Sequence, residues 1–451
     1  MKTKNYYRVL FAVLTVAISF SLTACEWLLD ELLRDSGSSS ISVSSLSSFG
    51  ILEKDYAQPA AQTITITNKS TGFISLTQPT AKNYTIGKLS KTGLEKGEKA
   101  TFTIRPILGL GIGTYNEIIK ITGTNNVSAE INAQLAIMED KIVTPIMQSS
   151  KSSPTNIVFL GDGFLLEDFI RGGLFESKAK ELLDYIISIQ PFTGYTDYIS
   201  AYWVSSVSEN RGAKTNPNDS MPKTLFNSTY NYLGTERLLV AQNYDLVRTY
   251  SKIAVDSPHI IVIIVNDSRY GGSGGEFSVT SVHNNAKEIT IHEIGHVFGL
   301  ADEYIDENFI KASDIKLENA AKQLNLDVTN DLSAIKWKHF VNRNGYNDNA
   351  YEGGYYFAKG VWRPTEESIM RSYKIMEFNA ISRETIVKKI IANAGETYNL
   401  QEFLARDVPP AGLRSVSALR GSDNPMPVPV EVYASALFGD ERIRARFIGE
   451  D

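Results

Sequence analysis

The stretch from Thr290 to Tyr304, TIHEIGHVFGLADEY, constrains the fold more than any other part of the chain. His292 and His296 stand four residues apart, so on a helix both imidazoles lie on one face, one turn apart. Gly299 follows where such a helix would end, because glycine tolerates the left-handed conformation that terminates helices. The sequence therefore predicts a helix that presents two histidines, followed by a sharp turn that brings the chain back toward them.

The same stretch offers the ligands of a catalytic zinc ion. Two imidazole nitrogens at this spacing suit tetrahedral zinc, and Glu293 between them can take a proton from a zinc-bound water. In the pattern H-E-x-x-H-x-x-G-x-x-H the third ligand stands six residues after the second histidine, and that residue is Asp302. Glu303 is the competing carboxylate, but the turn at Gly299 sets the reach and favours Asp302. An accidental H-E-x-x-H pattern is the alternative, and the glycine and the carboxylate argue against it.

A second segment, Ser368 to Tyr373 (SIMRSY), follows further along the chain. A methionine in a tight turn beneath the zinc is typical of metzincins, and Met370 would pack under the histidines as a polarizable floor. Two roles stay open for Tyr373: its hydroxyl could contact the metal or a developing oxyanion, or its ring could only pack. The catalytic candidates are therefore Glu293 as general base and Tyr373 as its partner.

The first residues have the pattern of an export signal. Basic residues precede an apolar core from Val9 to Leu22, which is too short for a comfortable membrane span. The segment ends in LTAC, which resembles the lipobox of bacterial lipoproteins, so residues 1–24 are predicted to be a signal peptide and Cys25 a lipid anchor. A secretory peptide with an incidental cysteine is the alternative. Cys25 is the single cysteine of the chain, which favours the lipobox and excludes an internal disulfide.

Composition sets further limits on partners and location. A chain of 451 residues with 43% hydrophobic content suits a globular protein of two or three domains. The net charge of −6 and the lack of a basic stripe exclude a nucleic-acid partner. Membrane attachment is expected through Cys25, and Glu26 beside it is not the aspartate associated with inner-membrane retention. We therefore expect a lipid-anchored protein of the bacterial cell envelope, at the outer membrane or cell surface.

A serine-rich tether over residues 25–40 leads into a region of short β-strands. Residues 63–67 alternate polar and apolar side chains, and the apolar residues between 129 and 137 are spaced to share one face. About a hundred residues of this texture predict one immunoglobulin-like β-sandwich over residues 41–138. Its role stays open between a spacer and a module that binds a glycan or a protein.

The remaining chain has the texture of an α/β domain. Residues 139–154 are predicted to be a linker, residues 155–400 the domain itself, and residues 401–451 a tail without an assigned role. The expected elements are strands at 156–160, 198–207 and 259–265, and helices at 165–190, 237–253, 285–298, 306–334 and 380–394.

A glycine-rich turn from Tyr270 to Gly275 separates two of these elements. It lacks the lysine of a phosphate-binding loop and the spacing of a dinucleotide fingerprint, so a nucleotide site is excluded. The segment from Glu276 to Val282 is short and mixed, as edge strands often are. Two interpretations stay open for it, pairing with an extended substrate chain and a plain hairpin.

Five stretches, in this order, resemble peptidase family M64, which is named for bacterial IgA metallopeptidases. The resemblance covers just over half of the chain and implies a zinc endopeptidase on a metzincin-like fold. It implies zinc ligands at His292, His296 and Asp302. Glu293 would then be the general base. The matching stretches are IVFLGDG at 157–163, PF at 191–192, Asn266 with 270–275, HEIGHVFGLADEY at 292–304 and RPTEESIMRS at 363–372.

The expected architecture is multidomain, an N-terminal all-β immunoglobulin-like sandwich followed by an α/β (α+β) metzincin-like zinc peptidase domain. The expected function is that of a surface-anchored zinc metalloendopeptidase, with proteins or peptides as substrates and host glycoproteins among the candidates. Two alternatives stay open: a surface binding protein whose peptidase domain is catalytically idle, and a zinc amidase that acts on non-protein amides. The intact His–Glu–His set argues against the idle domain.

Overall fold

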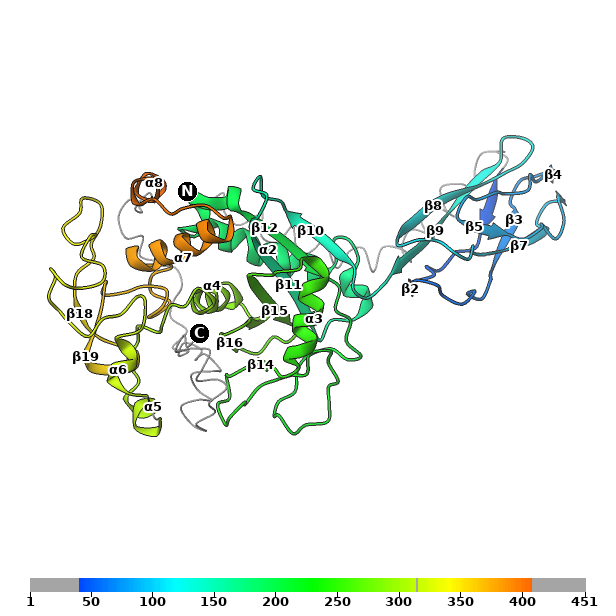
Figure 1. Ribbon diagram of the computed structural model, residues 1–451. Coiled ribbons are helices and arrows are strands. Elements are labelled where there is room, and N and C mark those ends of the chain that lie inside the picture. The colour runs from blue at the N-terminus through cyan, green and yellow to red at the C-terminus, as the bar shows by residue number, and fades with distance from the viewer. Residues whose placement is uncertain (1–39, 314, 408–451) are drawn as a thin grey trace, which may run out of the picture. The chain divides into compact units, whose positions relative to one another are not determined.

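The computed structural model describes residues 40–313 and 315–407, and Figure 1 traces its strands and helices. The chain divides into two compact units between Ile137 and Met138. Cys25, the signal segment before it and most of the predicted tether lie outside the described residues, as does the tail from residue 408. None of the helices in the described part is both long and apolar enough to cross a membrane.

The N-terminal unit consists of β-strands, as its alternating pattern predicts. One sheet has the strand order β1-β3-β7-β5, a second has β2-β9-β8, and β4 pairs with β6. The bounds are β1 Ile41–Val43, β2 Ile51–Glu53, β3 Gln62–Asn68, β4 Ile74–Ser75, β5 Tyr84–Ile86, β6 Gly93–Leu94, β7 Lys99–Pro106, β8 Gly113–Thr122 and β9 Ser128–Met138.

Alternation along these strands places every second side chain in one apolar core. Ile64 of β3, Phe102 of β7, Ile121 of β8 and Leu135 of β9 belong to the same buried cluster, so both sheets contribute to it. Burying a side chain of this size stabilises a fold by about 1.5–3 kcal/mol. The core of this unit therefore forms between the inward faces of the two sheets.

The C-terminal unit is built on a six-stranded sheet with the order β10-β12-β11-β15-β17-β16. The four inner strands are mutually parallel, and the two outer ones, β10 and β16, run antiparallel to their neighbours. Every side chain of β15, IIVIIV, is buried, as expected of a central parallel strand with both faces covered. The bounds are β10 Val143–Met147, β11 Thr155–Asp162, β12 Ile199–Val204, β15 Ile260–Val265, β16 Gly272–Ser273 and β17 Ser278–Ser281.

Helices cover this sheet. Helix α4, Ala286–Val297, contacts β15, β16 and β17 and lies beside α2, Leu174–Ser188. Helix α3, Tyr244–Ala254, packs onto β11 and β12. Two stretches of 3-10 helix, η1 at Leu166–Phe169 and η2 at Phe192–Tyr198, flank α2, so the helix predicted over 165–190 is interrupted before Leu174. Figure 1 shows α4 next to the β16 end of the sheet.

The predicted linker over residues 139–154 is wrong, because it contains strand β10. This strand pairs antiparallel with β12, and its register shifts between Pro145 and Met147. Proline cannot donate a hydrogen bond to a neighbouring strand, so it is tolerated at a sheet edge. The proline and the short length of this run obscured a strand that belongs to the sheet.

The helix predicted over 237–253 forms only in its second half, as α3. Its first half is extended: Val240–Ala241 (β14) pairs with Ser228–Thr229 (β13), and Leu238 bridges to Gly272 of β16. The helix expected over 306–334 is reduced to two short pieces, α5 Glu307–Ala312 and α6 Leu317–Ala320. Tertiary pairing overrides local helix propensity at both places.

The last described elements extend the unit beyond its predicted end at residue 400. An aromatic-rich hairpin, β18 Tyr351–Gly354 and β19 Phe357–Arg363, precedes α7, Ala380–Asn393. Helix α8 then spans Leu400–Arg406. Asp407 accepts hydrogen bonds of 2.7 and 2.8 Å from the Arg383 guanidinium, and Asp407 is 2% exposed. This buried ion pair fixes the chain after α8 to the body of the unit.

Candidate metal centre and catalytic site

Helix α4 presents both histidines of the H-E-x-x-H stretch to one point. The Nε2 atoms of His292 and His296 lie 3.2 Å apart. The helix ends at Val297 with Phe298 as its C-cap, and Gly299 adopts a φ of 81°, the left-handed conformation that the sequence predicts for it. The amide of Leu300 then donates to the carbonyl of Gly295, which closes the turn.

After this turn the chain brings Asp302 back to the histidines. Asp302 Oδ1 lies 3.2 Å from Nε2 of His292 and 3.5 Å from Nε2 of His296, and the Asp302 side chain is buried. Ligand atoms about 2.0–2.2 Å from a tetrahedral zinc ion are separated by about 3.3–3.6 Å. Two imidazole nitrogens and one carboxylate oxygen with these separations fit a zinc ion with one open position.

The hydrogen bonds around these side chains leave the three converging atoms available. His292 donates from Nδ1 to the carbonyl of Ile369 at 2.9 Å, and His296 donates from Nδ1 to the carbonyl of Leu300 at 2.8 Å. A proton on Nδ1 leaves the Nε2 lone pair free for a metal. The Tyr356 hydroxyl donates to Asp302 Oδ2 at 2.6 Å. Asp302 Oδ1 makes no hydrogen bond within the described residues.

The pKa values of His296 and Asp302 are both shifted, because the two side chains are buried next to each other. Burial acts to lower the pKa of His296, but the Asp302 carboxylate outweighs burial and raises that pKa to about 9. Burial acts to raise the pKa of Asp302, but the positive charge of His296 and the close contact with His292 hold it well below its usual range. Asp302 is therefore an anion next to the histidines, which is the form that binds a cation.

Glu293 is buried beside the three converging atoms. One of its carboxylate oxygens, Oε2, lies 3.9 Å from His296 Nε2, so Glu293 could also be counted in a metal-binding group with the histidines. Asp302 Oδ1, at 3.5 Å, is nearer to His296 Nε2 than Glu293 Oε2 is. Gly274 of the glycine run touches this carboxylate: a Cβ there would overlap Oε2 and lie 3.0 Å from His296 Cδ2.

Glu303, the competing carboxylate, is held away from the histidines. Its oxygens accept hydrogen bonds from Asn325 and Asn379, both at 2.7 Å, and from the hydroxyl of Ser368. Burial raises the pKa of Glu303, although these three donors oppose the shift. The Glu303 carboxylate is thus committed to a structural network and joins three separate chain segments behind the candidate metal site.

The floor beneath α4 is formed by Met370. A Cβ on Gly295 would overlap the Met370 sulfur, so the glycine between the two histidines allows the methionine to lie directly against the helix backbone. Met370 is fully buried, and its carbonyl accepts from the amide of Glu303 at 2.8 Å. The packing position expected for Met370 is the one observed.

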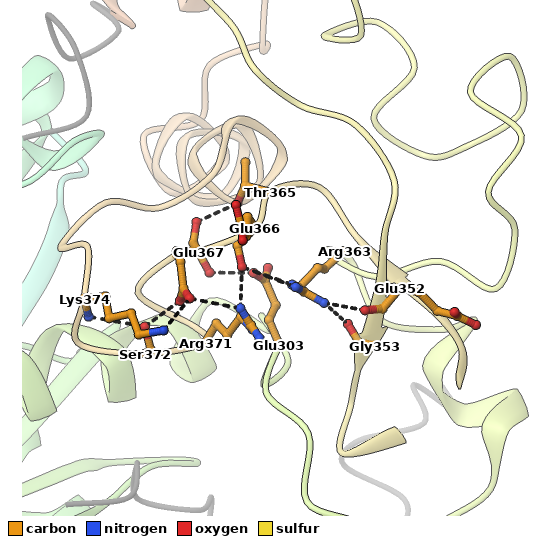
Figure 2. A network of polar contacts seen from close by, with 11 residues as sticks. Glu303, Glu352, Gly353, Arg363, Thr365, Glu366, Glu367, Arg371, Ser372 and Lys374 are labelled. Atoms are coloured by element: carbon orange, nitrogen blue, oxygen red, sulfur yellow. Dashed lines mark hydrogen bonds and ion pairs between the residues drawn. The ribbon is translucent and has the colours of Figure 1, made fainter. Parts of the chain in front are cut away.

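Two arginines fix the loop that carries this methionine (Figure 2). Arg363 donates to the carbonyls of Glu352 and Gly353 at 2.7 and 2.8 Å, which ties the loop to the β18–β19 hairpin. Arg371 donates to the carbonyl of Glu366 at 2.6 Å. A guanidinium can donate several bonds in fixed directions, so the arginines of the RPTEESIMRS stretch act as clamps at the two ends of the loop.

Tyr373 lies near Glu293 but contacts neither histidine in the described hydrogen bonds. Its hydroxyl is 3.4 Å from the hydroxyl of Tyr270. Burial raises the pKa of Tyr373 well above its ordinary value, and the negative charge of Glu293 adds to the shift. The Tyr373 hydroxyl therefore keeps its proton and is a hydrogen-bond donor at the edge of the site.

The edge of the sheet lies one strand further out than predicted. Strand β17 within the predicted segment 276–282 pairs with β15 on one side and with β16 on the other, so it cannot accept a substrate strand. The edge is β16, inside the glycine run, and Leu238 already bridges to Gly272 there. The glycines allow the backbone of this run to lie close to helix α4, because side chains at Gly272 and Gly274 would overlap Ile289 and Glu293.

Tyr356, whose hydroxyl donates to the third candidate ligand, was not among the predicted site residues. Tyr356 is 1% exposed and packs against Phe309 and Tyr304. Its φ of 71° is unusual for a tyrosine, but backbone angles are invisible in a sequence. The Asp302 contact spans 54 residues, and no local signal indicates it.

Comparison with protein families identifies the C-terminal unit. The family model described as IgA Peptidase M64 matches residues 144–347 and 342–390, which is more than half of the chain. The chain belongs to this family. Family membership supports peptidase activity, and the group of His292, Glu293 and His296 could hold a metal ion. The match begins inside β10, in agreement with the place of that strand in the sheet.

Comparisons with individual proteins add little. The curated proteins returned no match. Among solved structures, the VesB protease of Vibrio cholerae is 15% identical with a TM-score of 0.19, over 25% of this chain and 34% of that one. A Porphyromonas gingivalis protein of unknown function is 17% identical with a TM-score of 0.18, over 22% and 47%. This chain thus spans less than half of either structure, and TM-scores this low support no conclusion.

Proposed function

We propose that this chain is a zinc metalloendopeptidase in which His292, His296 and Asp302 hold the ion. The observation that carries the proposal is the convergence of two Nε2 atoms and Asp302 Oδ1 within 3.2–3.5 Å of one another. Buried polar atoms normally have hydrogen-bond partners, and an oxygen and two ring nitrogens facing one another are the arrangement a cation stabilises. When bound, zinc supplies a Lewis acid that polarises the scissile carbonyl and lowers the pKa of water.

Glu293 acts as the general base. Its carboxylate accepts a proton from the attacking water and then delivers it to the leaving amine, so one group serves both steps. The backbone at Gly274 lies against this carboxylate and confines it to the side of the three ligand atoms. Confinement keeps the base within reach of the water and prevents it from rotating into the place of a ligand.

Tyr373 donates a hydrogen bond to the oxyanion that forms as water attacks. Its raised pKa keeps the hydroxyl protonated at neutral pH, which a donor requires. Preorganised donors of this kind typically contribute about 10²–10³-fold to the rate. The Tyr270 hydroxyl at 3.4 Å holds Tyr373 in place before substrate binds.

The remaining expectations complete the proposal. The C-terminal unit is a metzincin-like domain, supported by the helix, the glycine turn and the methionine floor. The N-terminal unit is an immunoglobulin-like sandwich, supported by two sheets that share one core. We retain Cys25 as the proposed lipid anchor and the bacterial cell surface as the proposed location, both from the sequence pattern alone.

Cleavage of a diverse peptide library tests the proposal, with the chain lacking its signal segment and with Cys25 replaced by Ser. Glu293→Gln keeps the size of the side chain but removes the base, so we expect zinc to stay bound and cleavage to fall by about 10²–10⁴-fold. A zinc chelator should stop cleavage by the parent chain, and added zinc should restore it. Cleavage that survives both the chelator and Glu293→Gln would refute the mechanism.

A further inference from the structure

A large cavity with several polar residues in its lining opens beside the candidate catalytic site. Its volume is about 890 Å³, and its lining includes Arg237, Arg269, Tyr230 and Tyr270. This volume is in the range of sites that enclose a small molecule or several side chains. Tyr270 lines the cavity and also lies beside the candidate catalytic site, because its hydroxyl is 3.4 Å from that of Tyr373. The cavity wall therefore continues directly into the catalytic site.

The backbone brings the cavity close to the general base. Gly272 donates its amide to the carbonyl of Arg237 at 3.3 Å, and Gly274, two residues on, lies against Glu293. Two residues of extended chain span about 7 Å. A side chain one or two residues from the bond being cleaved could thus reach Arg237.

The charged groups of the cavity differ in their surroundings. Arg269 donates to both oxygens of Asp267, at 3.0 and 2.7 Å. Its guanidinium also lies over the Tyr230 ring. These contacts hold the Arg269 side chain in the lining of the cavity. Glu236 is exposed at the rim, whereas Arg237 is half-buried next to Tyr270. Burial raises the pKa of Tyr270, and the hydrogen bond with Tyr373 and the positive charge of Arg237 oppose the shift.

We propose that this cavity is the specificity pocket of the peptidase and that Arg237 selects substrates with a carboxylate near the scissile bond. A guanidinium binds a carboxylate through two parallel hydrogen bonds, and partial burial strengthens them. The carboxylate could belong to an Asp or Glu side chain or to the C-terminus of a peptide. This inference rests on the proposed peptidase function.

The test starts from one peptide that the full chain cleaves. Each position near the cleaved bond is changed between Glu and Gln, and the C-terminus is either free or amidated. At the recognised position we expect kcat/KM to fall about 10–100-fold on loss of the carboxylate. Arg237→Gln should abolish that difference, and Arg237→Lys should keep part of it. The control Arg171→Gln, an exposed arginine outside the cavity, should leave it unchanged.

Peptide binding separates this inference from the catalytic proposal. Fluorescence anisotropy of labelled Glu and Gln peptides on Glu293→Gln measures recognition without cleavage. The same preference for Glu, lost when Arg237→Gln is added, supports the inference even if the parent chain cleaves nothing. Metal- and Glu293-dependent cleavage with no carboxylate preference, or a preference that survives Arg237→Gln, overturns the inference and leaves the peptidase intact.

Discussion

Asp302 and Glu303 are adjacent in the chain, and both are buried, yet their surroundings are opposite. The Asp302 carboxylate has one oxygen held by Tyr356 and the other aimed at two imidazole nitrogens. The Glu303 carboxylate is surrounded by donors from Asn325, Asn379 and Ser368. Two adjacent residues therefore place one carboxylate against two imidazoles and the other in a saturated hydrogen-bond network.

Burial has a different consequence for each of these two carboxylates. A saturated network such as that of Glu303 rigidifies the segments it joins, because each lost hydrogen bond would leave a buried donor unpaired. An oxygen left without a donor costs free energy unless something else neutralises it. Alternate side chains of an extended segment point in opposite directions, so Asp302 and Glu303 face the site and the scaffold respectively.

Asp302→Ala should have the largest effect, because it removes a proposed metal ligand. Loss of a group that only orients a ligand weakens metal binding by about 10–100-fold, and loss of the ligand itself should exceed that. We expect less than one zinc per ten chains after dialysis and no detectable cleavage. Elemental analysis and a peptidase assay measure both. Full zinc occupancy in this variant would show that Glu293 or Glu303 replaces Asp302.

Asp348 sharpens the comparison, because its Oδ1 is also buried without a hydrogen bond in the described chain, but no histidine faces it. Burial raises the pKa of Asp348 to about 7, and Arg383 opposes the shift. Between pH of about 4 and 7 the folded protein holds a proton that the unfolded chain has lost, so stability falls as pH rises through this window.

Asp348→Asn should remove this pH dependence. Three pKa units correspond to about 4 kcal/mol, and we expect a gain of about 3 kcal/mol in the free energy of unfolding above pH 7. Below pH 4 the variant and the parent should be similar. Urea unfolding at several pH values measures the difference. Equal slopes of stability against pH in both proteins would mean that Asp348 is ionised in the fold.

Glu303→Gln tests the scaffold side of the comparison. The amide group of glutamine places donors against donors, so we expect a loss of about 2 kcal/mol in unfolding free energy. Zinc content at low temperature should stay near one per chain, since the ligands are untouched. Thermal unfolding together with elemental analysis distinguishes this outcome from loss of the metal. A zinc-free but fully stable variant would reverse the roles assigned to the two carboxylates.

Tyr356→Phe should have the smallest effect of the series. The ring still packs, but Asp302 Oδ2 loses its donor, so we expect zinc affinity to fall by about 10–100-fold. Competition with a chelator of known affinity measures this change. Tyr355→Phe is the matched control, because Tyr355 neighbours it in the same hairpin and no described hydrogen bond joins its hydroxyl to Asp302. Equal affinities for both variants would remove Tyr356 from the site.

The local parts of this molecule could be predicted from its sequence. Helix α4, the glycine turn and the order of His292, His296 and Asp302 depend on spacing within a few residues, which a sequence displays directly. Strands with regular alternation, such as β3 and β9, and the apolar β15 were equally accessible. Each of these features follows from the geometry of a single element.

The remainder depends on contacts between distant segments. Strand β10 is recognised as a strand only when β12 lies beside it, and residues 237–241 are extended because they pair with β13 and β16. Gly274 as a neighbour of Glu293 and Tyr356 as a partner of Asp302 are tertiary facts. The sequence contained these residues but no signal that joins them.

The hydrogen bond from His292 to the carbonyl of Ile369 spans 77 residues, and Met370 follows immediately. During synthesis, all three ligand side chains leave the ribosome well before the loop that sets the tautomer of His292 and supports the helix from below. A nascent chain that ends before residue 369 therefore carries the full H-E-x-x-H motif without an assembled centre. The order of the segments therefore delays assembly of this site until most of the domain has been made.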